Sequence, residues 1–493
     1  MTPRLNLATL ERLPRDLAPL VDPRALKVGI VHLGIGAFHR AHQAVYTEAA
    51  IAAEGGDWGI CGVTQRSAEV VEQLAPQDGL YTLAQRDGAG ERLRVIGAVR
   101  EVHWAQADAG AVRRRIAAPA TRLITLTVTE KGYHYDPATT RLALDDPAVA
   151  ADLADGGSRT AIGQLVGGLA QRREEDAGPV TVLCCDNLPD NGHVLRDLVA
   201  DFVAHSPDAG GLGDWIGASV RFPSTMVDRI TPATTEDDLA RIAAALGARD
   251  EGAVITEPFT QWVIEDDFAA GRPAWERAGA IMTSDVRPYE QIKLRLLNGA
   301  HSALAYLAVL AGDELVSDAV RPDGPFLAVL QKLMAVDVAP TLEVPGGFDL
   351  DAYQDELLER FANPALRHRT IQIAMDGSQK LPMRLLGTIR DRRRAGGEPV
   401  VASLGVAAWM RFVSARRSDG GRALTVDDPL AGEIAERLGG REDPEPVVAA
   451  LLSMRQIFNE ELAADAAWQA LLIDHLDALV RVGARGTARR VAG

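Results

Sequence analysis

Three polar residues interrupt an otherwise apolar stretch in the second half of the chain: Lys293, Asn298 and His301. Each of them could act on an alcohol or a carbonyl group. A lysine amine in apolar surroundings has a lowered pKa and can take and return a proton near neutral pH. An amide N–H can stabilise a developing alkoxide, and an imidazole can orient a neighbouring hydroxyl. The alternative is structural: the lysine extends to solvent, and other side chains satisfy the two remaining polar groups.

The stretch that carries these residues, 289–312, has the pattern of one buried amphipathic helix. Pro288 stands at its start and Gly312 at its end, which are positions that these residue types favour. At 3.6 residues per turn, the three polar side chains fall within an arc of about 140°. A single helix would therefore point all three into one cleft. Its apolar face has the spacing of a helix and is formed by Ile292, Leu296, Ala300, Leu304 and Leu307.

A glycine-containing turn near the N-terminus has the context of a dinucleotide-binding site. Residues 27–33 (K-V-G-I-V-H-L) are typical of a buried parallel strand, and a helical pattern extends from the turn to residue 53. The glycines let the backbone approach a pyrophosphate, which the N-terminus of a helix favours. A histidine stands where the third glycine of the fingerprint is usual, so a plain tight turn is the alternative. The candidate cofactor-binding residues are Gly34, Ile35, Gly36, Ala37, Phe38, His39 and Arg40.

The residues after the second predicted strand, 58–63, bear on the choice of cofactor. Glu69 could accept a hydrogen bond from the ribose 2′-hydroxyl and disfavour a 2′-phosphate, which indicates NAD. Arg66 argues in the other direction, because a cation there would accommodate the phosphate of NADP. NAD is the expected cofactor, and NADP is the alternative.

Further strand-like runs alternate with helical stretches, which predicts an α/β fold with a largely parallel sheet. Glu130 and Asn187 follow two of these strands, in the motifs T-E-K-G-Y and D-N-L-P-D-N-G. Ligands of such sheets bind beyond the carboxyl ends of the strands, so both residues are candidates for the site, although each could be an ordinary turn residue. Strands are expected at 81–85, 94–98, 123–128 and 180–185, and helices at 108–117 and 159–173.

The pattern changes near residue 284, where strands become scarce and helical periodicity dominates. With 493 residues, the chain is long for a single core. We therefore expect a Rossmann-type dinucleotide-binding domain at residues 1–283 and a mostly α-helical substrate and catalytic domain at residues 284–493. Within the second domain, residues 367–384 are rich in cations and amides. This segment could bind an anion or a sugar, or it could be a basic loop.

Composition argues against several classes of function. The formal net charge of −16 disfavours nucleic acid or an anionic membrane as the main partner. Uncharged apolar runs stay below the length of about 18 residues that spans a membrane, and the N-terminus lacks the apolar core of a signal peptide. The three cysteines are too few for a disulfide framework. We therefore expect no membrane partner and a location in the reducing cytoplasm.

Together, the motifs of this chain resemble the polyol-specific long-chain dehydrogenase/reductase family, which includes mannitol 2-dehydrogenases, arabinitol dehydrogenases and fructuronate reductases. The resemblance extends from the G-I-G-A-F-H-R-A-H-Q turn to the C-terminal helices. The matching motifs occur in order: T-V-T-E-K-G-Y at 127–133, C-C-D-N-L at 184–188, M-V-D-R-I-T-P at 226–232, E-P-F-T-Q-W-V-I-E-D at 257–266, G-R-P-A-W at 271–275 and K-L-R-L-L-N-G-A-H at 293–301.

The resemblance implies a metal-independent, NAD(P)-dependent oxidoreductase with its active site between two domains. It implies that Lys293 is the general acid and base. Asn187 and Asn298 would form an oxyanion hole, and His301 would hold a substrate hydroxyl. Glu130 would assist proton exchange between the lysine and solvent. Several relatives are monomers, so a monomer or a weak oligomer that acts on a small sugar acid or polyol is expected.

The resemblance leaves the substrate open between these two classes. Gln372 stands where mannitol 2-dehydrogenases have an arginine near the substrate, whereas Lys380 matches a lysine of the family. The block 367–382 is similar to the fructuronate reductase branch, and a hexuronate needs a cation such as Lys380 or Arg384 for its carboxylate. The motif E-P-F-T-Q-W-V also matches the polyol branch. Fructuronate reduction is the expected activity, and oxidation of mannitol or arabinitol is the alternative.

Two readings from outside this family differ in what they require of the sequence. A zinc alcohol dehydrogenase needs well-spaced cysteine and histidine ligands, which the adjacent cysteine pair and the scattered histidines do not offer. A nucleotide-binding sensor without catalysis would keep Gly34 and Gly36 but would not need the polar residues of the stretch 289–312. Loss of turnover on chelation would support the first, and unchanged turnover in Lys293→Ala would support the second.

Overall fold

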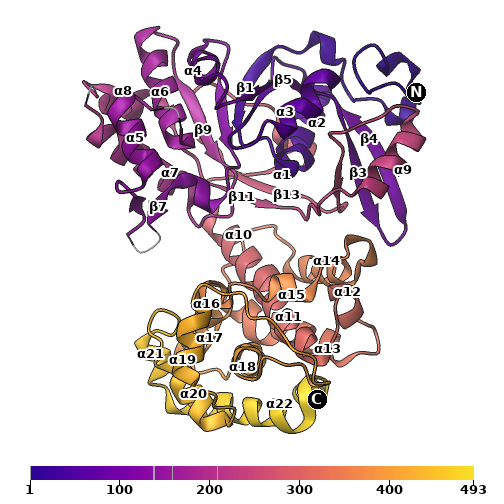
Figure 1. The fold of residues 1–493 in the computed structure, drawn as a ribbon, viewed down its shortest axis with the longest axis vertical. Coiled ribbons are helices and arrows are strands. Elements are labelled where there is room, and N and C mark those ends of the chain that lie inside the picture. Colours follow the sequence, from indigo (N-terminus) through magenta and orange to yellow (C-terminus); the bar gives the residue numbers. More distant parts are fainter. Residues whose placement is uncertain (1, 137–138, 158, 208) are drawn as a thin grey trace. The chain divides into compact units, whose positions relative to one another are not determined.

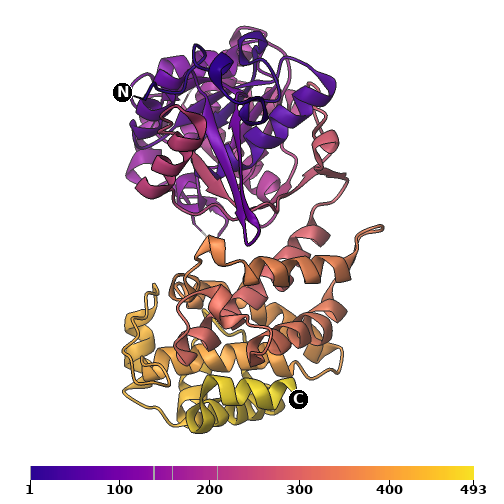
Figure 2. The same cartoon turned by 90° about the vertical axis from the view of Figure 1, so that its right-hand side faces the viewer.

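The computed structural model describes residues 2–136, 139–157, 159–207 and 209–493 of the chain. The chain divides into two compact units, unit 1 at Met1–Arg287 and unit 2 at Pro288–Gly493. Figure 1 and Figure 2 show that unit 1 combines strands with helices and that unit 2 is built of helices. Each unit is described by itself below.

A parallel sheet of six strands forms the centre of unit 1, in the order β10-β9-β6-β1-β2-β5. Every pair of neighbouring strands in this sheet is parallel. The first three strands of this sheet along the chain lie in the order third, second, first, and the next three continue beyond the first, which is the Rossmann arrangement. The predicted α/β fold class is therefore confirmed. The strands are β1 (Val28–Leu33), β2 (Gly59–Thr64), β5 (Val99–Trp104), β6 (Leu123–Leu126), β9 (Val180–Cys184) and β10 (Val220–Arg221).

Helices cover both faces of this sheet and bury both sides of its central strands β1, β2, β6 and β9. Val31 and Leu33 of β1 face a core shared with α4 (Ala109–Ala117), α6 (Ala161–Glu174) and α7 (Asn191–His205). Ile30 faces the opposite core, which is shared with α2 (Gln43–Glu54). This alternation follows from the period of two residues in a strand. Because both faces are covered, the central strands are continuous apolar runs.

Two predicted strands do not join the parallel sheet. β3 (Tyr81–Asp87) and β4 (Gly90–Ile96) form an antiparallel hairpin, and β12 (Val254–Thr256) pairs with β3. The reason is the tight D-G-A-G connection, since two strands joined by a short turn can only run antiparallel. A third sheet contains β11 (Thr225–Asp228), β13 (Gln261–Glu265) and β14 (Ile281–Thr283). The remaining elements of unit 1 are α3 (Glu69–Leu74), α5 (Pro147–Asp155), α8 (Leu212–Ser219), α9 (Glu236–Leu246) and the strand pair β7 (Tyr135–Asp136) and β8 (Arg141–Leu142).

The helix predicted to follow the glycine turn is interrupted. α1 (Ala37–Ala41) ends at His42, whose φ of −121° and ψ of −88° are not helical, and α2 begins at Gln43. The ring of His42 packs against Phe38, Tyr46 and Trp262. The helix is thus interrupted at a residue whose ring makes tertiary contacts, and the local sequence pattern did not predict this interruption.

Unit 2 is organised around three long apolar helices, α11 (Ala300–Ala311), α18 (Val400–Ala415) and α22 (Ala466–Ala492), which pack against one another. Trp409 of α18 and Trp468 of α22 are buried in this core, and the Trp468 indole donates a hydrogen bond to Ser403 Oγ (2.9 Å). The surrounding helices are α10 (Arg287–Ile292), α12 (Val316–Ala319), α13 (Pro325–Lys332), α14 (Leu350–Ala362), α15 (Thr370–Ile373), α16 (Gly377–Leu381), α17 (Gly387–Arg394), α19 (Ala431–Leu438), α20 (Pro444–Leu452) and α21 (Glu460–Ala463).

One helical stretch, Arg287–Ala311, has the length and mean hydropathy of a membrane span. Its most apolar window is 78% buried inside the protein, as expected for the core helix of a folded unit. It ends at Gly312, whose φ of +89° terminates the helix in the left-handed region that glycine favours. The predicted helix end is therefore confirmed.

Candidate active site

Glycine is required at the first position of the turn after β1. Gly34 has a φ of +101°, and a Cβ atom there would lie 2.1 Å from the carbonyl oxygen of Thr127, at the end of the neighbouring strand β6. A larger residue would strain the backbone and displace that strand end. The Gly34 N–H also donates to the Val63 carbonyl oxygen (2.7 Å). The turn is thus fixed between the ends of β2 and β6.

Gly36 leaves space on the outer side of the same turn. A Cβ atom there would have the Gly34 carbonyl oxygen, 3.8 Å away, as its nearest neighbour. The first three N–H groups of α1 precede the first hydrogen bond of the helix, which joins the Arg40 N–H to the Gly36 carbonyl oxygen (3.2 Å). They therefore have no acceptor within the helix. Close backbone approach and outward N–H donors are what the pyrophosphate of a dinucleotide needs, so these residues fit that group.

The place of the third glycine is filled by a stacked pair of histidine rings. The ring centroids of His39 and His32, a residue of β1, are 3.4 Å apart. His32 Nδ1 lies 2.7 Å from Thr125 Oγ1, and its Nε2 lies 2.9 Å from Thr127 Oγ1. Burial lowers the pKa of His32 to about 3 although the Gly34 carbonyl opposes this, and burial lowers the pKa of His39 well below its ordinary value. Two neutral, buried and stacked rings therefore stand where the usual fingerprint has its third glycine.

Two other candidates for cofactor binding point into the protein. The Arg40 guanidinium is buried and donates hydrogen bonds to the carbonyl oxygens of Gly252 (2.5 Å) and Gly36 (3.3 Å). The Ile35 side chain packs on Gly62 of β2, where a Cβ atom would lie only 2.2 Å from it. We therefore expect Arg40 to hold the turn through the protein backbone and Ile35 to take part through its backbone alone.

The end of β2, where the adenosine ribose of a dinucleotide lies in this fold, has no carboxylate at its first positions. Thr64 Oγ1 donates to the Ser67 carbonyl oxygen (2.9 Å), and the Gln65 amide exchanges two hydrogen bonds with Gln164. Arg66 is exposed, and the Glu69 carboxylate accepts a hydrogen bond from Gln73 on its own helix (3.2 Å). Arg66 is thus the charged group nearest in sequence to the end of the strand.

Asp186, which the sequence prediction did not single out, joins the two strand ends that carry Glu130 and Asn187. Its carboxylate accepts hydrogen bonds from the N–H groups of Val128 (2.9 Å) and Thr129 (3.1 Å) and from the Tyr133 hydroxyl (2.7 Å). Burial raises the pKa of Asp186, these hydrogen bonds oppose the rise, and the nearby Glu130 adds to it. A signal was available, since this acid directly follows a buried strand.

The loop held by Asp186 stores backbone strain. Thr129 has a φ of +67° and a ψ of 159°, a region that is essentially restricted to glycine and costs about 1–3 kcal/mol. Such strain persists only where surrounding contacts impose it. Glu130 and Asn187 are both exposed at this edge of the sheet. On the other side of the loop, the buried amide of Asn191 donates to the Asp186 and Thr225 carbonyl oxygens (3.0 and 2.8 Å).

In unit 2, the helix that carries the three polar residues is not a uniform α-helix, contrary to the prediction. α10 is followed by a π-helical segment, η7 (Lys293–Gly299), and α-helical geometry resumes with α11 at Ala300. The lysine is buried, at 7% exposure, and Asn298 is half-buried. The backbone hydrogen bonds of a π-helix join residues that are five apart in the sequence, which is also the separation of Lys293 and Asn298. Short π segments are frequent at functional sites.

His301 is buried in an aromatic and cationic environment. Its ring stacks on Phe361 and meets His368 edge-on, with centroid distances of 4.9 Å in each case. Burial lowers its pKa well below the ordinary value, and the charges of His368, Arg384, Arg360 and Lys380 lower it further. Its Nε2 atom is buried and meets no hydrogen-bond partner among the residues that the structure describes. A neutral imidazole with an unsatisfied nitrogen is thus held in a positive field.

The candidate substrate-binding residues differ in how they are held. Arg384 Nη1 donates to Ser302 Oγ (3.0 Å), next to His301. Lys380 Nζ donates to the carbonyl oxygens of Ile373 (3.3 Å) and Met375 (2.6 Å), which anchors its amine to the end of α15. Gln372 is exposed. Arg384 and Lys380 therefore share the surroundings of His301, whereas no contact in the described chain ties Gln372 to them.

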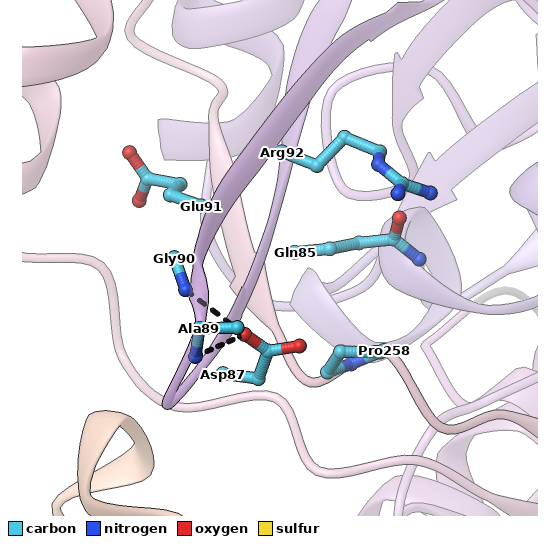
Figure 3. Close-up of a pocket in the computed structure, with 7 residues that line it drawn as sticks. All are labelled: Gln85, Asp87, Ala89, Gly90, Glu91, Arg92 and Pro258. Atoms are coloured by element: carbon cyan, nitrogen blue, oxygen red, sulfur yellow. Dashed lines mark hydrogen bonds between the residues drawn. The ribbon is translucent and has the colours of Figure 1, made fainter.

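A pocket of about 280 Å³ lies at the tip of the β3–β4 hairpin (Figure 3). The Asp87 carboxylate closes the turn by accepting hydrogen bonds from the N–H groups of Ala89 (2.8 Å) and Gly90 (3.0 Å). Arg86 and Arg241 both donate to the Glu91 carboxylate. The carboxylates of Asp87 and Glu91 are thus engaged in hydrogen bonds of the hairpin itself, and we assign the pocket no catalytic role.

One group of potential metal ligands occurs in the described part of the chain, Cys61, Glu101 and His103, whose ligand atoms lie within 4.8 Å of one another. Arg115 donates two hydrogen bonds to the Glu101 carboxylate. Contact with His103 and Arg115 lowers the pKa of Glu101 to about 2, while burial raises the pKa of the Cys61 thiol. A guanidinium in this position repels a cation, so we assign no metal to the group.

A Rossmann sheet with a glycine turn, together with a buried lysine, a buried imidazole and a half-buried amide on a second, helical unit, is the combination expected of a dinucleotide-dependent dehydrogenase. Comparison with known proteins narrows the class. The model of the mannitol dehydrogenase Rossmann domain matches residues 28–277, and the model of the mannitol dehydrogenase C-terminal domain matches residues 285–480. The chain belongs to the mannitol dehydrogenase family, whose members are NAD-dependent enzymes acting on CH–OH groups.

Individual relatives are similar over nearly their full length. The chain is 45% identical to the uncharacterised oxidoreductase YeiQ of Escherichia coli K12 over 481 residues, 95% of this chain and 97% of the relative. It is 42% identical to the D-mannonate oxidoreductase of the same organism over 473 residues, covering 95% and 96%. The solved structure of Pseudomonas fluorescens mannitol 2-dehydrogenase in complex with NAD and D-mannitol has a TM-score of 0.85, 36% identity and 99% coverage of both chains.

Proposed function

We propose that this chain interconverts D-fructuronate and D-mannonate with NAD as coenzyme. The bound nicotinamide supplies or accepts the hydride. Lys293 gives a proton to the substrate oxygen in reduction and takes it back in oxidation. Asn187 and Asn298 donate hydrogen bonds to that oxygen as negative charge develops on it. Residues 1–283 bind the coenzyme, and residues 284–493 supply the lysine and bind the substrate.

Two further residues complete the proposed mechanism. His301 is neutral and donates or accepts a single hydrogen bond through Nε2, which suits a hydroxyl next to the reacting carbon. Glu130, exposed on the strained loop held by Asp186, relays the proton between Lys293 and solvent. Among the coenzyme contacts, the backbone of Gly36, Ala37, Phe38 and His39 receives the pyrophosphate.

We prefer a sugar acid to a polyol as the substrate because of the residues around His301. An unsatisfied buried imidazole nitrogen next to Arg384, Arg360 and Lys380 suits a ligand that has both hydroxyls and a negative charge. A guanidinium has five N–H donors, so an arginine that holds Ser302 can also bind a carboxylate in a forked geometry. The 42% identity to a D-mannonate oxidoreductase supports the same substrate.

The second candidate is a mannitol 2-dehydrogenase, which the 36% identical structure with bound D-mannitol favours. In that case the cations near His301 would bind neutral hydroxyls.

Under either function, we propose that the enzyme is cytoplasmic and is a monomer or a weak oligomer. Light scattering of the purified enzyme tests its oligomeric state.

The first experiment is the initial rate of NADH oxidation with D-fructuronate and with D-fructose, each repeated with NADPH. We expect a large kcat/KM advantage for fructuronate, and an advantage for fructose would assign the mannitol activity.

Arg384→Gln should lower kcat/KM for fructuronate about 10- to 100-fold, as expected for loss of a charge-assisted hydrogen bond, and should affect fructose less. Gln372→Arg should shift the ratio towards fructose, and an unchanged ratio would remove Gln372 from the specificity site.

A further inference from the structure

Unit 2 contains three π-helical segments, and the one that carries Lys293 contacts both of the others. They are η7 (Lys293–Gly299), η8 (Leu333–Val338) and η11 (Pro382–Leu386), and η7 packs against η8 and η11. A π turn is rare because each of its turns is wider than that of the α-helix. Two of them packed against the third indicate that tertiary packing maintains this geometry.

The π geometry of η7 decides where its two polar side chains point. In an α-helix, residues five apart diverge by about 140° around the axis. In η7 the backbone hydrogen bonds themselves span five residues, so Lys293 and Asn298 come onto one face. The proton donor and the alkoxide-binding amide are therefore closer in direction around the axis while this register persists than they would be in an α-helix.

Arg295 is placed to hold this register. Its side chain is 11% exposed, and Nη2 donates to Asp391 Oδ2 (2.5 Å) while Nη1 donates to the Thr341 carbonyl oxygen (3.0 Å). Asp391 lies on α17, directly after η11, and Thr341 lies in the short 3₁₀ turn after η8. One guanidinium thus ties η7 to the segments that follow both other π turns.

A second contact fixes the end of η7. Gly299 lies so close to η11 that a Cβ atom there would be 2.7 Å from the Arg384 carbonyl oxygen. We propose that Arg295 is a positioning residue, which maintains the π register of η7 against α17 and η11 and thereby keeps Lys293 and Asn298 on one face. This inference rests on the proposed roles of Lys293 and Asn298.

The test compares Arg295→Met and Arg295→Lys with Arg393→Met as the matched control. Arg393 is half-buried in unit 2 and donates two hydrogen bonds, both to Asp465, which lies outside η7. We expect Arg295→Met to lower kcat by about 10- to 100-fold, as misplacement by about 1 Å does, with an unchanged Kd for NAD. Arg295→Lys should recover part of the loss, and Arg393→Met should leave kcat unchanged.

A double-mutant cycle separates positioning from a general loss of stability. If Arg295 acts through the face shared with Asn298, Arg295→Met should cost less than about 3-fold in kcat in an Asn298→Ala background, because coupled residues are not additive. The same factor in both backgrounds, or no loss in Arg295→Met, would overturn the inference. If Arg295→Met does not fold, Asp391→Asn provides the same cycle, since it removes the ion pair and leaves the bond to Thr341.

Lys293→Ala distinguishes this inference from the proposed function. Retained turnover in Lys293→Ala would contradict the proposed mechanism itself. Loss of turnover in Lys293→Ala together with normal turnover in Arg295→Met would contradict the positioning role alone.

Discussion

In unit 1, Gly34, Glu130 and Asn187 stand after the carboxyl ends of β1, β6 and β9, whereas in unit 2 Lys293, Asn298 and His301 stand on one continuous helical stretch. The loops are fixed by polar side chains, above all by the half-buried Asp186, whose carboxylate accepts hydrogen bonds from two backbone N–H groups and a tyrosine hydroxyl. The helix is fixed by its own backbone register and by the ties of Arg295 to neighbouring segments.

This difference changes which residues determine the geometry. A loop site depends on the few side chains that satisfy its backbone groups, so a single anchor controls several candidate residues. A helix site depends on register, so a change in the turn type moves every side chain along it. The anchors are therefore separate from the candidate residues in both units, and variants of each kind should have different consequences.

The largest effect should come from the helix itself. Lys293→Ala should lower kcat in both directions by about 10²- to 10⁴-fold, the usual contribution of a general acid or base. Lys293 must be deprotonated to act as a base, so the rate of alcohol oxidation should rise with pH in the wild-type enzyme and should not do so in Lys293→Ala. NAD binding should persist, as measured by fluorescence titration.

Lys332→Ala is the matched control for that variant. Lys332 is another lysine of unit 2, and its amine donates to the Val491 carbonyl oxygen (2.8 Å). Its removal should leave kcat and the pH profile unchanged. A Lys293→Ala enzyme with the turnover of this control would exclude the lysine from the chemistry.

Asp186→Ala tests how far the loop residues of unit 1 depend on a single anchor. Without the Asp186 carboxylate, the N–H group of the strained Thr129 loses its acceptor, and Glu130 and Asn187 lose their common support. We expect kcat to fall by up to about 10²-fold through misplacement, and the free energy of unfolding to fall by about 1–3 kcal/mol through unsatisfied donors. Asp197→Ala, an exposed carboxylate on α7, should change neither quantity.

A smaller effect is expected at the coenzyme end of unit 1. Arg66 is exposed after β2, and the positions around it carry amides and hydroxyls, so we expect measurable use of NADPH beside NADH. Arg66→Ala should lower kcat/KM for NADPH about 10-fold, through loss of a charged hydrogen bond to the 2′-phosphate, and should spare NADH. Arg92→Ala on the β3–β4 hairpin is the control. Equal losses with both coenzymes would place Arg66 away from the ribose.

Local signals in the sequence were sufficient for the elements but not for their final geometry. The strand before Gly34, the end of the helix at Gly312 and the alternation of strands and helices follow from short-range propensity and periodicity, and the structure confirms them. The π register of η7 was not predictable in this way, because Arg295, which we propose maintains it, binds partners far along the chain. The position of Asp186 after a strand could have marked it as a candidate, but its anchor role depends on hydrogen bonds to Val128 and Thr129, which are far away in the sequence.

The smallest effect should leave both candidate sites untouched and report only on the stability of unit 1. Asp238 caps α9: its carboxylate accepts hydrogen bonds from the Thr235 N–H (3.0 Å) and from Arg86 and Arg241 (2.8 Å each). Burial raises its pKa, but the hydrogen bonds from Arg241, Thr235 and Arg86 outweigh burial and hold the pKa of Asp238 well below its usual value.

The sign of the pH dependence follows from that shift. A carboxyl group whose pKa is lower in the folded state stabilises the fold above its unfolded pKa of about 3.9 and loses this contribution as pH falls towards the folded value. Asp238→Asn should therefore cost about 1 kcal/mol at pH 7, as loss of a capping interaction does, and progressively less below about pH 4. Urea unfolding across this range, with the exposed Asp237→Asn as control, measures it. A constant difference at all pH values would show that the lost hydrogen bonds do not depend on the charge of Asp238, and any change in kcat would connect α9 to the site.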